Sequence, residues 1–173
     1  IIKNFASQYP EKINCILHKV NQRPENISNQ GIKLAKGKYI AWNDSDDFWY
    51  PNKLEKQIAI FRRKPNIELV YSYGVNIIES KTRYRSAINA NDLELDVFKQ
   101  LFRSAFFMKV SMVARKEIYD KISWGNKKYI YCGDYEWMLR VAAAGYTFDC
   151  VPEVLVGHRI HDTNETKDIV TAQ

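Results

Sequence analysis

We predict from the sequence a single α/β domain over residues 1–173, with a mixed sheet and helices on both of its faces. Strand and helix patterns alternate in the first half of the chain, whereas the strand patterns of the second half are spaced less regularly. A length of 173 residues suits one domain with a real core and is short for two. The apolar fraction of 46% and the aromatic fraction of 13% exclude a disordered chain.

The first half begins with helix, strand, helix and strand. Pro10 ends the first helix, which looks like the last turns of a longer one, and Gly37 is placed to stop the second. The apolar spacing predicts these elements over residues 1–8, 13–17, 24–36 and 39–42.

The next helix begins near Pro51, whose fixed backbone angle suits a first helical turn, and ends before Pro65. Its predicted core-facing stripe is Leu54, Ile58 and Phe61. A strand follows over residues 67–73, and residues 75–78 either continue that strand or pair with it.

The second half begins with a polar stretch, residues 81–91, which we predict to be a loop of the kind that covers a ligand. Gly145 closes the best-marked helix of this half. We predict helices over residues 95–102, 116–122 and 133–144, and strands over residues 110–114, 147–151 and 154–160.

The formal charge of +6 comes from 26 basic and 20 acidic residues scattered along the sequence. A scattered distribution predicts a solvated surface with mild attraction to anions, and argues against a nucleic-acid-binding protein, which would show a dense basic stripe or a recognisable motif. A peripheral role at an anionic membrane surface stays open, with no sequence motif to support it.

The three cysteines Cys15, Cys132 and Cys150 form no close pair, and their spacing is not that of a zinc site. We predict buried free thiols at Cys15 and Cys150, in a reducing compartment. No apolar run approaches the roughly 20 residues of a membrane span, and no signal peptide is visible. The first residue, Ile1, is typical of a fragment or a processed chain.

Three carboxylates, Asp44, Asp46 and Asp47, directly follow the predicted strand over residues 39–42. Like charges packed so closely repel unless a cation or hydrogen-bond donors compensate, and an oxygen-rich cluster suits Mg²⁺ or Mn²⁺. The alternative is an ordinary turn, because Asp and Ser side chains readily bond local backbone groups. The position favours a ligand site, since open α/β sheets bind ligands at the carboxyl ends of their strands.

A second acidic feature begins the helix predicted over residues 133–144. Asp134 precedes Trp137 and Met138 by three and four residues, so it lies on the apolar inner side of the helix, whereas Glu136 points elsewhere, toward solvent. Asp134 is equally consistent with an N-terminal helix cap and with a general base aimed at a substrate hydroxyl.

The end of the chain carries a third polar group. On a strand, Arg159 and His161 face one way while His158 and Ile160 face the other. A guanidinium and an imidazole on one face suit phosphate oxygens or a bound metal, although a single His near a terminus is more often structural.

Four segments together make the chain similar to the family 2 glycosyltransferases of the GT-A fold. In order they are Asn29-Gln-Gly-Ile-Lys-Leu-Ala-Lys-Gly-Lys-Tyr-Ile, Asp-Ser-Asp-Asp-Phe-Trp-Tyr-Pro-Asn-Lys-Leu, Gly-Asp-Tyr-Glu-Trp-Met-Leu-Arg-Val-Ala-Ala-Ala-Gly-Tyr and Arg-Ile-His. The resemblance covers nearly the whole length. It implies a GT-A-like, Rossmann-like mixed sheet that is truncated at its N-terminus, because the family's first two strand motifs, which grip the nucleotide base, are absent.

The resemblance also implies roles for individual residues. Asp134 matches the catalytic base, although the Glu that precedes it in the family is Gly133 here. Arg23 and Ser28 replace a usual Gly and Arg, and His158 replaces a frequent Tyr. The implied substrate-binding residues are Asp44, Asp47, Asn29, Trp137 and Arg159, and the implied ligands of Mn²⁺ or Mg²⁺ are Asp46, Asp44 and His161. Asp47 would also brace the acidic loop, and Trp137, Trp49 or Tyr50 would offer a flat face to a sugar, although each is equally suited to a core.

We therefore expect a metal-dependent, inverting transferase of the hexosyltransferase type. It would move a sugar from a nucleotide-diphosphate sugar, with UDP as the expected nucleotide, to the hydroxyl of a saccharide or lipid-linked acceptor. Polysaccharide biosynthesis for the cell envelope is the expected setting, in the cytoplasm or at the inner face of the membrane, and the sequence leaves an oligomer open. The alternative is a non-catalytic nucleotide-sugar or carbohydrate-binding module with a degenerate GT-A fold. A structural calcium-binding domain is a third interpretation.

Overall fold

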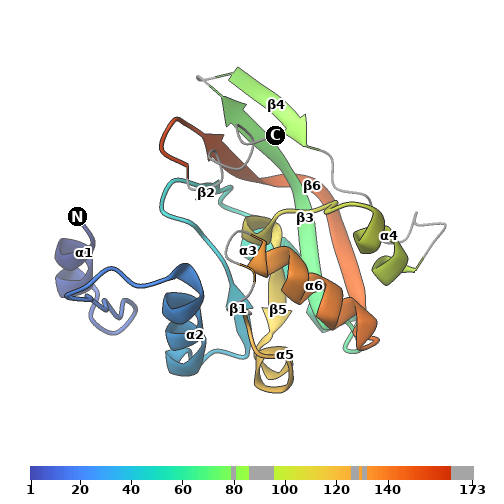
Figure 1. The fold of residues 1–173 in the computed structure, drawn as a ribbon, viewed down its shortest axis with the longest axis horizontal. Helices are drawn as coiled ribbons and strands as arrows, with labels where there is room; N and C mark the ends of the chain where they lie inside the picture. Colours follow the sequence, from blue (N-terminus) through green and yellow to red (C-terminus); the bar gives the residue numbers. More distant parts are fainter. Residues whose placement is uncertain (79–80, 86–95, 126–128, 130–131, 165–173) are drawn as a thin grey trace.

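A mixed β-sheet lies at the centre of the protein (Figure 1). The computed structural model describes residues 1–78, 81–85, 96–125, 129 and 132–164. Within these residues the strand order is β1 (Tyr39–Ala41), β5 (Val113–Arg115), β3 (Leu69–Ile78), β6 (Phe148–Ile160) and β2 (Phe48–Trp49), with β4 (Lys81–Arg85) paired to β3. The β3 and β6 strands are parallel and the other pairs are antiparallel, so the predicted mixed sheet is confirmed.

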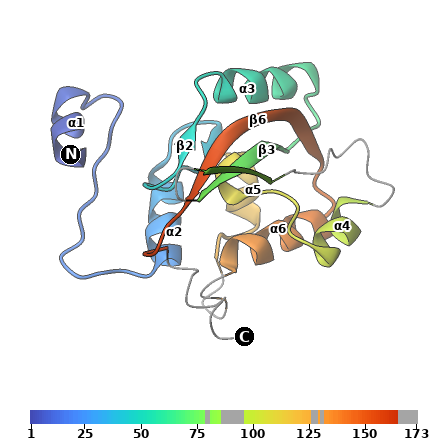
Figure 2. The ribbon, with the colours of Figure 1, turned by 90° about the horizontal axis from the view of Figure 1, so that it is seen from above.

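Helices cover both faces of this sheet, as predicted (Figure 2). One face is covered by α3 (Lys53–Arg63), and the other by α4 (Val97–Arg103), α5 (Lys116–Lys121) and α6 (Gly133–Ala143). The remaining helices are α1 (Ile2–Gln8), α2 (Pro24–Leu34) and the short 3-10 helix η2 (Lys109–Ser111).

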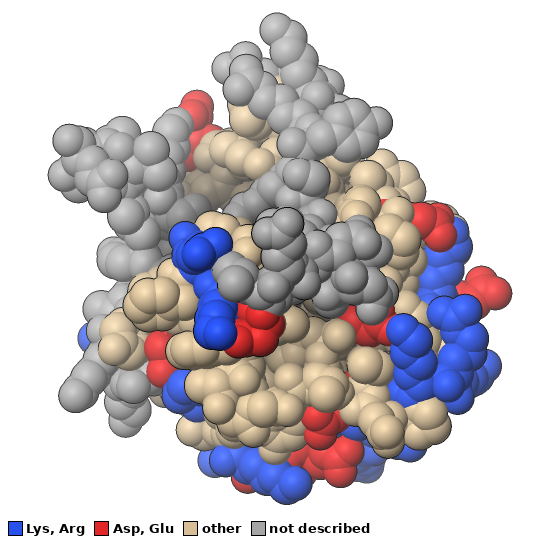
Figure 3. Space-filling model, turned by 90° about the vertical axis from the view of Figure 1, so that its right-hand side faces the viewer, with Lys and Arg blue, Asp and Glu red and all other residues tan. Residues whose placement is uncertain are grey.

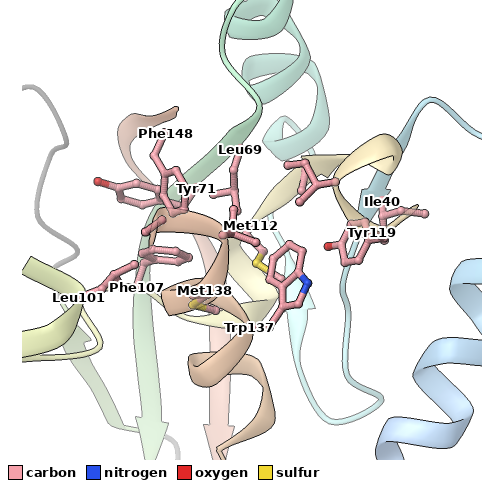
Figure 4. Close-up of a cluster of buried hydrophobic side chains, with 14 of the residues drawn as sticks. Ile40, Leu69, Tyr71, Leu101, Phe107, Met112, Tyr119, Trp137, Met138 and Phe148 are labelled. Carbon is pink, nitrogen blue, oxygen red and sulfur yellow. The ribbon is translucent and has the colours of Figure 1, made fainter. Parts of the chain in front are cut away.

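The alternation of side chains along β3 explains the two layers. Leu69 and Tyr71 belong to the larger core beneath α6, whereas Val70, between them, packs with Ile60 and Phe61 of α3. Figure 4 shows the larger core, in which Trp137 and Tyr71 are both fully buried.

The predicted strand over residues 13–17 is wrong, because the structure shows no regular element there. Ile16 and Leu17 are 40% and 63% exposed, and no neighbouring strand pairs with this segment in the described part of the chain. A short apolar run gains strand structure only from a partner. The preceding helix α1 lies to one side of the body and buries none of its residues (Figures 1 and 2).

The two strands predicted near the C-terminal end are one strand, β6. Its pairing with β3 slips around Pro152, so that Ser72 faces Val151 while the next residue, Tyr73, faces Val154. Proline has no backbone N–H to give to a ladder, and the strand bulges there without ending.

The loop predicted over residues 81–91 is wrong for residues 81–85, which form β4. Residues 86–91 lie outside the described residues. The sequence also failed to predict β2, in which Phe48 pairs with Gly157. A Cβ atom at Gly157 would lie 2.3 Å from the Phe48 ring, so the aromatic side chain occupies the space that glycine leaves.

The buried side of α3 differs from the predicted stripe. Phe61 is buried, but Leu54 is 42% exposed and its place is taken by Lys53, which is 0% exposed. The Nζ of Lys53 has no hydrogen-bond partner in the described structure and lies 4.4 Å from the ring centroid of Trp49. Desolvation lowers the pKa of Lys53 to about 7.

None of the three cysteines forms a disulfide in the described structure; Cys150 is buried as predicted, Cys15 is partly buried and Cys132 is exposed. Basic and acidic side chains are interspersed over the described surface of the face in Figure 3. Among the described residues, the helices are too short or too polar to cross a membrane.

Candidate active site

A pocket of about 780 Å³ opens where several segments that are distant in the sequence meet. Its walls come from the acidic loop after β1, the first turns of α2 and α6, the residues around η2 and the end of β6. Asp46 and Asp134 both line this pocket, together with Asp44 and Asp47. Had Asp46 and Asp134 been on opposite sides of the molecule, the structure would have contradicted the predicted transferase function.

Asp46 is held by the segment that ends β6. His161 Nε2 and Asn164 Nδ2 each lie 3.1 Å from Asp46 Oδ2. An Arg159 guanidinium N–H donates to the main-chain carbonyl of Asp46 at 2.6 Å. The predicted common direction of Arg159 and His161 therefore brings both side chains to the same acidic residue.

Asp47 joins the acidic loop to β6. It is 7% exposed, and its Oδ1 accepts the backbone N–H of Arg159 at 3.0 Å. Desolvation raises the pKa of Asp47, and the Arg159 N–H and nearby His158 oppose part of that rise. A buried carboxylate that accepts a backbone N–H holds the acidic loop against β6.

Asp44 contacts a cation that the sequence analysis missed. The Nζ of Lys109 donates to Asp44 Oδ1 at 2.8 Å and lies 5.8 Å from the ring centroid of Trp42. Lys109 lines the pocket and comes from η2. A single lysine after an apolar run carries no sequence signal for this contact.

Asp134 lies in the first turn of α6, on the side that faces the core. Trp137, Met138 and Val141 are buried, which confirms the predicted inner side of the helix. The Asp134 Oδ1 accepts the N–H of the adjacent Tyr135 at 2.8 Å, and Cys132, not Asp134, occupies the N-cap position.

Three expectations for neighbouring residues need correction. Trp137 is 0% exposed and its Nε1 donates to the carbonyl of Ile122, so it belongs to the core and has no face open to a sugar. Asn29 lines a different, smaller pocket beside α5. Glu136 is partly buried and ion-paired with Arg140 at 2.7 Å instead of pointing freely to solvent.

The predicted metal ligands are only partly brought together. Asp46 contacts His161, whereas Asp44 contacts Lys109. Within the described residues, no three His, Cys, Asp or Glu side chains are grouped closely enough to hold a metal by themselves. The chemistry of the Asp46 carboxylate and the His161 imidazole nonetheless fits a divalent ion that takes its other ligands from water and phosphate.

Known proteins resemble this chain in sequence. An uncharacterised glycosyltransferase of Rickettsia typhi is 28% identical over 171 residues, which are 95% of this chain and 52% of that protein. A second, from Methanocaldococcus jannaschii, is 29% identical and matches 91% of this chain and 55% of its own length. The amylovoran biosynthesis glycosyltransferase AmsB of Erwinia amylovora is 25% identical, with coverages of 86% and 51%. The chain thus spans about half the length of these relatives.

The fold resembles solved structures of S. aureus TarS, residues 1–349. The complex of TarS with UDP-GlcNAc superposes with a TM-score of 0.64 at 12% identity, covering 94% of this chain and 47% of TarS. The complex with UDP gives a TM-score of 0.62 at 13% identity, with coverages of 91% and 47%. These structures confirm the GT-A-like fold. The family model of glycosyl transferase family 2 matches residues 1–142, and the chain belongs to that family.

Proposed function

We propose that the protein transfers a sugar from a nucleotide-diphosphate sugar to an acceptor hydroxyl, with inversion at the anomeric carbon. The observation that carries this proposal is the shared pocket of Asp46 and Asp134. A transferase needs a group that supports the leaving diphosphate and a base that activates the acceptor, and both must reach one cavity.

The acidic loop is the proposed donor end of the pocket. Asp46, with His161 beside it, would hold Mn²⁺ or Mg²⁺, which when bound would stabilise the negative charge on the departing nucleotide. Asp47 and Arg159 fix the loop, and Lys109 holds the Asp44 carboxylate at the pocket wall. Arg159 and Lys109 also add positive charge near the site of the diphosphate.

Asp134 is the proposed base. The Tyr135 N–H fixes the orientation of the Asp134 carboxylate at the pocket wall. Asp134 takes the proton of the acceptor hydroxyl as the oxygen attacks the anomeric carbon, opposite the departing diphosphate. Attack from the opposite side inverts the configuration of that carbon.

A UDP-sugar is the proposed donor, supported by the similar fold of TarS, whose structures contain UDP and UDP-GlcNAc. A saccharide or lipid-linked acceptor in polysaccharide biosynthesis is proposed from the relative named for amylovoran biosynthesis. The proposed location is the cytoplasm or the inner face of the membrane, where nucleotide sugars would be available.

Release of UDP from UDP-sugars, with and without Mn²⁺, tests this function in the full-length protein. We expect release by the parent, and a loss of about 100-fold or more in Asp46→Asn and Asp134→Asn. Glu55→Gln is the control, because Glu55 is an exposed acid in the first turn of α3. Binding of UDP without release would instead make the protein a nucleotide-sugar-binding module.

A further inference from the structure

Glu25 is a buried carboxylate in the wall of the same pocket, and none of the roles above uses it. It lies in the first turn of α2 and is 7% exposed. Its Oε1 is buried and has no hydrogen-bond partner within the described structure. A buried carboxylate oxygen without a hydrogen bond is costly to keep, so it points to a partner that the described part of the protein does not supply.

The surrounding chain holds Glu25 in this position. Gly125 has a φ of +67°, and a Cβ atom there would lie 2.9 Å from the Glu25 Cβ. The backbone of Gly125 therefore packs directly against the Glu25 side chain. The adjacent Trp124 also lines the pocket, is 5% exposed and stacks on Trp42 with 4.4 Å between ring centroids. Such packing keeps the carboxylate from turning out to solvent.

The charge of Glu25 limits the ligand that fits. The Glu25 carboxylate repels a diphosphate. The cation Lys109 of the same pocket is bonded to Asp44 and not to Glu25. Hydroxyl groups are neutral donors that satisfy a buried carboxylate without a second charge. A sugar ring carries several hydroxyls and apolar C–H faces, and the pocket offers the apolar side chains of Phe107, Met108 and Trp124 beside the acids.

We infer that Glu25 binds hydroxyl groups of a sugar ring in the pocket. This inference rests on the proposed transferase function. Two sugars have the required chemistry, the transferred sugar of the donor and the acceptor saccharide. A purely structural role is the competing explanation, because an acid in the first turn of an α-helix also interacts favourably with the helix dipole.

Binding measurements on the full-length protein distinguish these cases without any turnover. The probes are UDP, UDP-glucose and UDP-GlcNAc in the presence of Mn²⁺, and the methyl glycosides of glucose, galactose and mannose. The variants are Glu25→Ala and Glu25→Gln, and Glu55→Ala is the matched control, an exposed acid in the first turn of another helix of the same length.

We expect Glu25→Ala to weaken binding of a sugar-bearing probe about tenfold or more, with a smaller loss in Glu25→Gln, which keeps an acceptor oxygen. Weaker binding of a UDP-sugar with unchanged binding of UDP identifies the transferred sugar, and weaker binding of a methyl glycoside identifies the acceptor. The Kd of UDP and the melting temperature should stay the same or improve, because the variant removes an unpaired charge.

Unchanged Kd values of the Glu25 variants for every sugar-bearing probe would overturn the inference. It would also be overturned if the parent bound no UDP-sugar more tightly than UDP and bound no methyl glycoside. A lowered melting temperature with a uniform loss of UDP binding would show that Glu25 is structural. Failure of the proposed function has a different signature, the absence of UDP release from a parent that still binds these probes.

Discussion

The backbone N–H of Arg159 donates to the carboxylate of Asp47 at 3.0 Å, which ties the acidic loop to the end of β6. The loop follows β1 at one edge of the sheet, and β6 lies beyond β5 and β3. Asp47 directly precedes β2, which pairs with β6, so this hydrogen bond continues the contact between the two segments beyond the β2–β6 pairing and next to Asp46.

Asp47→Ala should lower the free energy of unfolding by about 1–3 kcal/mol, because the Arg159 N–H loses its acceptor. Asp47→Asn keeps an acceptor oxygen and removes a buried charge, so its stability should stay within about 0.5 kcal/mol of the parent. Urea unfolding at pH 7.5 measures both. Equal destabilisation by the two variants would mean that the charge of Asp47, not the hydrogen bond, holds the loop.

The buried Lys53 should make stability depend on pH. Its ordinary pKa is near 10.5 and its folded-state pKa is about 7, so between these values the unfolded chain holds a proton that the folded protein has lost. Stability therefore rises as pH increases from about 7 to about 10.5. The rise is at most about 5 kcal/mol.

Lys53→Met should stabilise the protein at pH 7 and flatten this rise, measured by urea unfolding across the same pH range. Methionine has a similar length and no charge to bury. The matched control is Lys56→Met in the same helix, where Lys56 is partly exposed and paired with Glu153. A Lys53→Met protein with the parent's pH dependence would show that Lys53 is not the source of this rise.

Lys109→Met should weaken UDP binding about tenfold, because Asp44 loses its partner and the pocket loses a positive charge. Lys109→Arg should retain most of the affinity. Isothermal titration calorimetry measures both, and Lys121→Met, at an exposed position of α5, controls for the change in net charge. Full affinity in Lys109→Met would remove this lysine from the donor site.

Gly157→Ala should destabilise the protein by about 1–3 kcal/mol, because the new methyl group would overlap the Phe48 ring. Thermal unfolding measures the effect. Adding Phe48→Ala should recover part of the loss, since it vacates the space that the methyl group needs. Gly31→Ala is the control, because a Cβ atom at this helical position meets nothing within 4 Å, and it should leave stability unchanged or raise it.

Sequence patterns predicted the positions of site residues correctly where the helix or strand repeat alone sets the direction of the side chain. A helix repeat of about 3.6 residues places Asp134 on the side of Trp137 and Met138, and strand alternation sends Arg159 and His161 the same way. The strand predicted over residues 13–17 was wrong because no strand pairs with it in the described structure. The sugar-binding role implied for Trp137 was also wrong, because its ring is enclosed by the core, the alternative that the sequence had left open.

By itself the sequence determined the family, the alternation of strands and helices, and an acidic loop at the exit of a strand, because these follow from the order of residues along the chain. Only the tertiary structure decided that Asp46 and Asp134 share a pocket, that Lys109 pairs with Asp44, and that the buried Oε1 of Glu25 has no partner among the described residues. These facts depend on contacts between distant segments, and burial is a property of the whole packed molecule that no local spacing encodes.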